Sequence, residues 1–118
     1  MRADNNFTIT NKTRSKLPRV NFLGIKNHAL GKSYWLSLVF IDKEESRKLN
    51  LTYRGKNKPA NILSFPLDKK TGEILICSAM AKKEETSLFI HGLLHLKGMS
   101  HGSTMEKAES KLRKKFGV

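Results

Sequence analysis

The 118-residue chain lacks the features that would assign it to several common protein classes. It has one cysteine, Cys77, which excludes an intramolecular disulfide and is too few for a cysteine-rich zinc finger. No apolar run approaches the roughly 20 residues of a membrane-spanning helix, and the N-terminal stretch has no apolar signal region. We therefore expect a globular, cytoplasmic protein with a single domain over residues 1–118.

Acidic residues are also scarce. The chain has 10 aspartates and glutamates against 23 lysines and arginines, which gives a net charge of +13. Such an excess on a small domain favours binding to polyanions. No basic amphipathic helix with a bulky apolar face stands out, so the charge indicates nucleic acid rather than a membrane. A solvated, lysine-rich surface without a partner is the alternative.

The hydrophobic pattern predicts an α+β domain with a mixed sheet of about four strands and helices packed over it. Two of the strands should form a hairpin joined by a five-residue turn. The predicted strands lie at residues 7–10, 34–40, 61–67 and 73–77. The predicted helices lie at residues 18–30, 42–53, 79–98 and 103–116.

Helix ends have sequence signals of their own. Asp42 with Glu45, and Ser103 with Glu106, have the spacing of capping boxes, in which each side chain bonds the backbone of the other residue. The second half of the 79–98 helix is nearly all apolar, so this helix should be buried at the centre of the domain.

Histidine is rare, but three of the four histidines fall within residues 91–101. His91 and His95 are four residues apart and would share one face of a helix, where both rings can reach the same ion. Gly98 would end the helix and let His101 return as a third ligand. Three protein ligands leave a coordination position for water, which is typical of catalytic zinc sites.

The histidine spacing is similar to that of the long zinc-protease motif, with one difference. Gly92 stands where those enzymes have the glutamate that acts as general base, so a peptidase is disfavoured. The alternative for the histidines is an ordinary place in the core. Three imidazoles beside a helix-ending glycine favour a metal site, because imidazoles are costly to bury without partners.

The stretch HGLLHLKGMSH, residues 91–101, resembles the signature of the YbeY family, which are bacterial ribosomal RNA maturation factors described as metal-dependent endoribonucleases. NLTYRGKNKPANILSFP, residues 50–66, resembles a second family block, and Gly72 to Ile74 a third. The resemblance covers roughly residues 34–106. It departs from the family at Ser100, where the family has aspartate, and in residues 78–90, which are shorter by about one helix. That shortening would alter one wall of the cleft or merge two helices into one.

The resemblance implies a site and a cofactor. Arg54 occupies the family's arginine position and would bind phosphate, with Lys56, Lys58 and Ser64 as further RNA contacts. The metal would be one zinc ion per chain, or another divalent transition metal. Zinc on three imidazoles lowers the pKa of bound water to about 7. The resulting hydroxide would attack the phosphodiester or deprotonate the ribose 2′-hydroxyl, and the sequence leaves both routes open.

These observations predict a zinc-dependent endoribonuclease in ribosomal RNA maturation. By the resemblance, it would act in late small-subunit processing and ribosome quality control. Its partners would be ribosomal RNA, the small ribosomal subunit and ribosomal proteins, without a membrane. One alternative is a non-catalytic, ribosome-associated RNA-binding factor with a structural metal. The other is a single-metal hydrolase for a small phosphate ester or an amide, which would not need such a positive charge.

Overall fold

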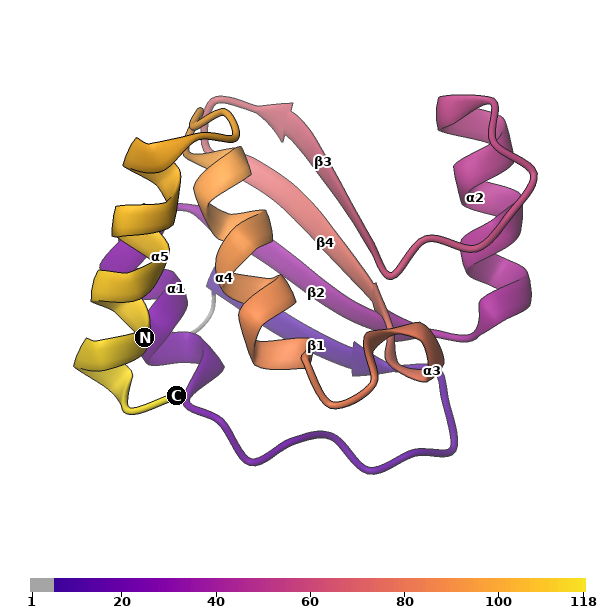
Figure 1. Cartoon of the computed structure of the whole chain (residues 1–118), viewed down its shortest axis with the longest axis horizontal. Coiled ribbons are helices and arrows are strands. Elements are labelled where there is room, and N and C mark those ends of the chain that lie inside the picture. The colour runs from indigo at the N-terminus through magenta and orange to yellow at the C-terminus, as the bar shows by residue number, and fades with distance from the viewer. Residues whose placement is uncertain (1–5) are drawn as a thin grey trace.

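The computed structural model describes residues 6–118, and in this range it has four strands and five helices (Figure 1). The strands are β1 (Phe7–Asn11), β2 (Trp35–Ile41), β3 (Ile62–Asp68) and β4 (Thr71–Cys77). The helices are α1 (Phe22–Leu30), α2 (Lys43–Arg54), α3 (Ser78–Ala81), α4 (Glu85–Leu96) and α5 (Ser103–Phe116). None of these helices has the length and apolar character of a membrane span.

The strands form one mixed sheet in the order β1-β2-β4-β3. β1 pairs with β2, and β2 with β4, in parallel, whereas β3 pairs with β4 in antiparallel fashion at the edge. This architecture confirms the predicted α+β class and the mixed sheet of four strands. Pro66 lies on the edge strand β3, where the amide hydrogen that proline lacks is not needed by a second neighbour.

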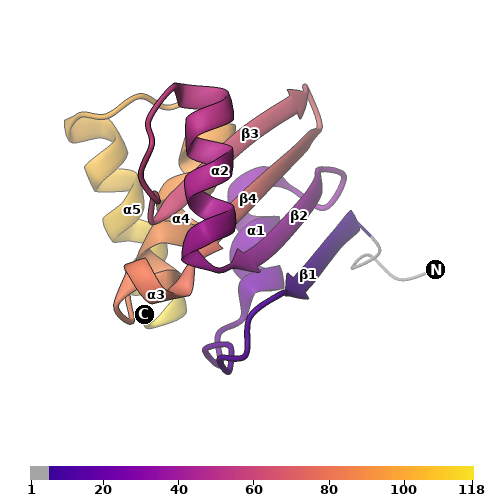
Figure 2. The same cartoon turned by 90° about the vertical axis from the view of Figure 1, so that its right-hand side faces the viewer.

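Helices cover the two faces of the sheet unequally (Figures 1 and 2). α1, α4 and α5 pack on one face, where their apolar residues join Leu38, Phe40 and Ile76 of the sheet in the larger core. α2 lies over the other face, where a smaller cluster forms around Leu63 and Leu75. α4, which covers the second half of the helix predicted over 79–98, packs in the larger core.

The predicted five-residue hairpin turn is wrong. Asp68 pairs with Thr71 across the ladder, so Lys69 and Lys70 alone connect β3 to β4. The Asp68 carboxylate accepts a hydrogen bond from the Lys70 amide at 2.8 Å, which stabilises the tight turn. Asp68 and Thr71 thus extend the pairing of β3 with β4, although the polar composition of this stretch indicates a loop.

The predicted helix over 79–98 is also wrong, because the segment forms two helices, α3 and α4. Lys82 and Lys83 separate them with φ values of 51° and 70°, in the left-handed region. The break falls in the polar stretch K-K-E-E, where no buried apolar residue requires the helix to continue. The shortened segment has therefore not merged two helices into one.

The capping prediction for α2 is half right, and the one for α5 is wrong. The Asp42 side chain accepts a hydrogen bond from the Glu45 amide at 2.8 Å, as predicted, but the Glu45 carboxylate accepts one from Lys12 rather than from the Asp42 amide. Gly102, not Ser103, caps α5, and it does so without a side-chain hydrogen bond. The φ of 150° at Gly102 is open to glycine, so the chain enters α5 one residue earlier than a serine cap would allow.

The first helix begins later than predicted. Pro18 lies in the connection before α1, which starts at Phe22. Asn21 caps the helix by accepting a hydrogen bond from the Gly24 amide at 2.9 Å. Gly31 ends the helix with a φ of 90°, as predicted.

Candidate metal centre

Helix α4 fixes the first two histidines. Phe89, Ile90 and Leu93 are almost completely buried against the sheet and α1. Their burial determines which side of the helix faces the core, so His91 and His95 emerge half-buried on an adjacent side. The positions of both rings thus follow from the packing of the helix rather than from a flexible loop.

Gly92 allows this packing. A Cβ atom at this position would lie 2.9 Å from the Ser64 hydroxyl and 3.0 to 3.1 Å from side-chain carbons of Ile62 and Ile74. The helix backbone therefore approaches β3 and β4 closely at a point where a side chain does not fit. A glutamate, the residue of the zinc proteases at this position, would not fit the same helix packing. The close packing at Gly92 is thus consistent with the absence of that base.

The turn after α4 brings in the third histidine. The Gly98 amide donates to the His95 carbonyl at 2.9 Å, and the Met99 amide donates to the Leu94 carbonyl at 3.0 Å. Gly98 has a φ of 102°, which favours glycine, and the chain reverses here. His101 follows this reversal and lies exposed at the mouth of the site.

The three imidazoles converge. Each of His91, His95 and His101 offers one ring nitrogen, and these nitrogens lie within 4.8 Å of one another. The ring centroid of His101 is 4.9 Å from that of His91 and 4.7 Å from that of His95. Such a convergence matches a set of ligands around a single ion.

The hydrogen bonds at the outer ring nitrogens orient two of these ligands. His91 Nδ1 lies 2.7 Å from a carboxylate oxygen of Glu109, and His95 Nδ1 lies 3.1 Å from the Met99 carbonyl oxygen. Carboxylate and carbonyl oxygens only accept hydrogen bonds, so both Nδ1 atoms donate, and in the neutral rings both Nε2 atoms carry lone pairs. The two Nε2 atoms are 3.0 Å apart. Two lone pairs held this close fit a shared cation.

Electrostatics favours the neutral ring at His95. Burial lowers the pKa of His95 below its usual value, and the neighbouring His91 and His101 lower it further, partly opposed by the hydrogen bond to Met99 and the charge of Glu109. A neutral imidazole is the form that binds a metal. The donor set therefore fits a divalent transition metal.

Sequence reasoning missed Glu109. It lies on α5, half-buried, four residues after Met105 and three before Leu112, both of which are buried. These intervals place Glu109 on the apolar side of α5 that packs in the larger core. A carboxylate on the apolar stripe of an amphipathic helix is the signal that would have identified it.

The histidines line a cleft of about 410 Å³. Arg54 and Ser64, two of the predicted site residues, line the same cleft. Asn61 and Ile62 complete its lining, and neither was predicted. The predicted RNA contacts Lys56 and Lys58 are exposed in the loop after α2 and do not line it.

Arg54 reaches the cleft from the end of α2. Gly55 ends that helix in the left-handed conformation, with a φ of 72°. Arg54 is exposed, and the ion pairs within residues 6–118 involve other side chains. An exposed arginine can instead serve only to pair with a surface carboxylate, and the described part of the chain gives no support to that interpretation of Arg54.

Known proteins resemble this chain in sequence and fold. The sequence profile of the family described as Endoribonuclease YbeY matches residues 3–116. A Rubrobacter xylanophilus protein named Endoribonuclease YbeY is 40% identical over 78 residues, which are 63% of this chain and 58% of that relative. The solution structure of a Thermotoga maritima protein has a similar fold, with a TM-score of 0.59 and 23% identity over 90% of this chain and 85% of that one. The chain belongs to the YbeY family.

Proposed function

We propose that this protein is a zinc-dependent endoribonuclease that acts on ribosomal RNA. The observation that carries the proposal is the shared cleft, in which a metal-binding set of three histidines lies beside Arg54. The family and the name of the Rubrobacter relative support RNA as the substrate. The net charge of +13 supports a polyanionic partner.

His91, His95 and His101 would hold the metal, and zinc suits this nitrogen donor set. When bound there, a zinc ion supplies Lewis-acid activation of water near neutral pH. The protein contributes by orienting the imidazole rings of His91 and His95. Glu109 and the Met99 carbonyl keep both Nε2 lone pairs directed at the shared position, so little rearrangement is needed on binding.

Arg54 would bind the scissile phosphate. A guanidinium presents several donors in a fixed plane and can contact two phosphate oxygens at once. Negative charge on these oxygens grows as the phosphodiester is cleaved, and a cation beside them stabilises that charge. Ser64 and Asn61 line the same cleft and would offer hydrogen bonds to the substrate.

The proposed setting is the maturation of the small ribosomal subunit in the cytoplasm, with ribosomal RNA and ribosomal proteins as partners. The alternative of a purely structural metal is weaker, because structural zinc sites are closed by four protein ligands. Here the group within residues 6–118 has three histidines, and His101 is exposed at an open cleft.

The salt dependence of RNA binding, together with a comparison of two substrates, tests the choice of substrate. The zinc-loaded protein should cleave a fragment of ribosomal RNA, and binding should weaken steeply as salt rises, because each phosphate contact releases counterions. A small phosphate ester, p-nitrophenyl phosphate, serves as the comparison. Turnover of that ester without cleavage of RNA would refute the proposal and favour the small-substrate hydrolase.

A further inference from the structure

The metal cleft does not end at His91. A second hollow of about 350 Å³ adjoins it, and both cavities share Asn61, Ile62 and His91 as lining residues. The second hollow continues between α4 and α5, where Ser87 and Arg113 contribute polar groups. The two cavities therefore lie side by side, with His91 lining both.

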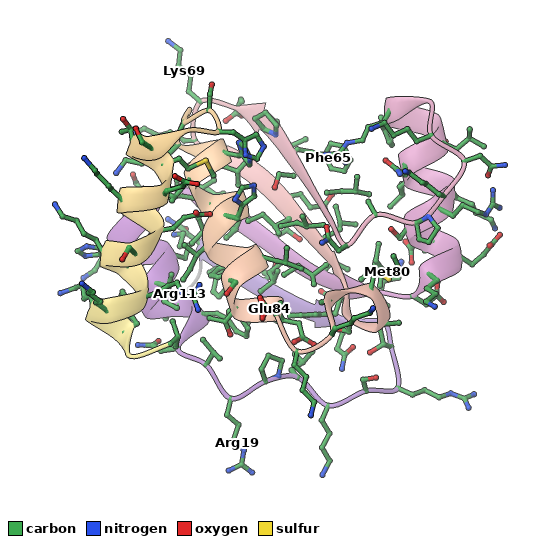
Figure 3. All side chains as sticks on the ribbon, viewed as in Figure 1. Arg19, Phe65, Lys69, Met80, Glu84 and Arg113 are labelled. Carbon is green, nitrogen blue, oxygen red and sulfur yellow. The ribbon has the colours of Figure 1, made fainter. Side chains whose placement is uncertain are left out.

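Arg113 places a guanidinium in the lining of this hollow, which also contains the carboxylate of Glu109. Arg113 follows Glu109 by four residues on α5, so both side chains lie on one side of the helix, and both line the hollow. Figure 3 shows Arg113 between α5 and α4. Arg113 is exposed, whereas the Glu109 carboxylate is engaged by His91 at 2.7 Å. The ion pairs found within residues 6–118 do not include Arg113.

We propose that this hollow is a second phosphate subsite, which binds the backbone of the RNA strand next to the cleavage point through Arg113. The inference rests on the proposed endoribonuclease function, because an enzyme that cuts inside a strand must hold nucleotides on both sides of the scissile bond. Arg54 contacts the scissile phosphate and Arg113 a neighbouring phosphate, with the histidines between them. The strand then runs along the two neighbouring cavities.

Glu109 determines where the phosphate lies within the hollow. Its carboxylate would repel a phosphate placed against it, so the phosphate would bind at the Arg113 guanidinium and the Ser87 hydroxyl, which line the same hollow. The hydroxyl of Ser87 can donate to a phosphate oxygen, and the guanidinium of Arg113 can contact two. The same helix α5 thus supports a metal ligand through Glu109 and binds substrate through Arg113.

Binding of an RNA that cannot react through a 2′-hydroxyl tests the subsite, with the length of the oligonucleotide checked after each titration to account for direct attack on the phosphodiester. We would measure fluorescence anisotropy of 2′-O-methyl RNA oligonucleotides of two and six residues with the zinc-loaded full chain, at several salt concentrations. Arg113→Ala should weaken binding of the longer oligonucleotide about tenfold. It should also reduce the slope of log affinity against log salt by about 0.7, the value for one lost contact to a single strand. Binding of the dinucleotide, which does not reach the hollow, should be unchanged.

Arg19→Ala is the matched control. Arg19 is an exposed arginine in the connection before α1, away from both cavities (Figure 3), and its loss removes the same charge. Arg113→Lys should keep the salt slope, because it keeps the charge. If Arg113→Ala matches Arg19→Ala in affinity and slope, the subsite is wrong.

Cleavage of a ribosomal RNA fragment by the same proteins separates the two proposals. Cleavage by the wild type, with equal RNA binding by Arg113→Ala and Arg19→Ala, would overturn the subsite and leave the proposed function standing. A wild type that neither binds nor cleaves RNA would overturn both. A selective loss of long-oligonucleotide binding in Arg113→Ala, with zinc content unchanged, would support the subsite.

Discussion

The two sides of the metal cleft are held in opposite ways. His91 and His95 lie on α4, whose neighbouring residues are buried in the larger core, and their Nδ1 atoms are fixed by hydrogen bonds. Arg54 lies at the exposed end of α2, next to a left-handed glycine, over the thinly covered face of the sheet. Two of the three candidate metal ligands are thus preorganised, whereas the hydrogen bonds and ion pairs within residues 6–118 do not hold the exposed Arg54 side chain. Substitutions on the two sides should separate metal binding from substrate chemistry.

The largest effect should follow from His95→Ala. Loss of one of three ligands should reduce zinc affinity by more than the roughly 10- to 100-fold that loss of an outer hydrogen-bonding partner costs. RNA cleavage should be abolished. Elemental analysis and circular dichroism check this together, because the half-buried His95 is not part of the core and the variant should stay folded. Retention of one zinc per chain would contradict the ligand assignment.

Arg54→Ala should act on the other side of the cleft. Cleavage should fall by about 10²- to 10³-fold, because a cation at the developing charge is lost, while zinc content stays at the wild-type level. Single-turnover cleavage with saturating protein measures the effect. Lys48→Ala is a suitable control, since Lys48 is exposed on the same helix and does not line the cleft. Equal cleavage by the two variants would remove Arg54 from the mechanism.

Glu109→Gln should sharpen the comparison between the two sides. The amide oxygen of glutamine can still accept from His91 Nδ1, but more weakly than a carboxylate. Zinc affinity, measured by competition with a chelator, should fall by about 10-fold, and Glu109→Ala should approach 100-fold. Glu106→Gln is the control, because Glu106 is exposed on the same helix. No change in affinity with Glu109→Ala would show that Glu109 does not position His91.

The smallest effect is expected from Gly92→Ala, which adds one methyl group where α4 approaches the sheet. We expect the free energy of unfolding to fall by about 1–3 kcal/mol, because the Ser64 hydroxyl and the Ile62 and Ile74 side chains must move away. Urea unfolding of the metal-free protein measures this without a contribution from zinc binding. Unchanged or higher stability would show that the close approach does not restrict this position.

Local spacing was enough to predict that the three histidines converge. His91 and His95 differ by one helical turn and Gly98 marks the reversal, so the cluster could be inferred from eleven residues of sequence. The association of Arg54 with the histidines came from the family resemblance, because no local rule relates the end of α2 to α4. In the structure, Arg54 and the three histidines line the same cleft.

Contacts between distant elements could not be predicted in the same way. Glu109 is 18 residues from His91 on another helix, so its hydrogen bond depends on how α5 packs against α4. The break at Lys82 and Lys83 depends on backbone conformations that lysine seldom adopts and that its sequence context does not specify. The strands were predicted because alternation and burial are properties of short segments.

Zinc bound by the three histidines should drive RNA cleavage in this cleft. The most direct test is to strip the protein with a chelator and titrate zinc back while measuring cleavage of a ribosomal RNA fragment. Cleavage should be absent without metal, rise with added zinc and saturate at one ion per chain. Cleavage that is equally fast in the stripped protein, or that never appears when one zinc is bound, would contradict the account.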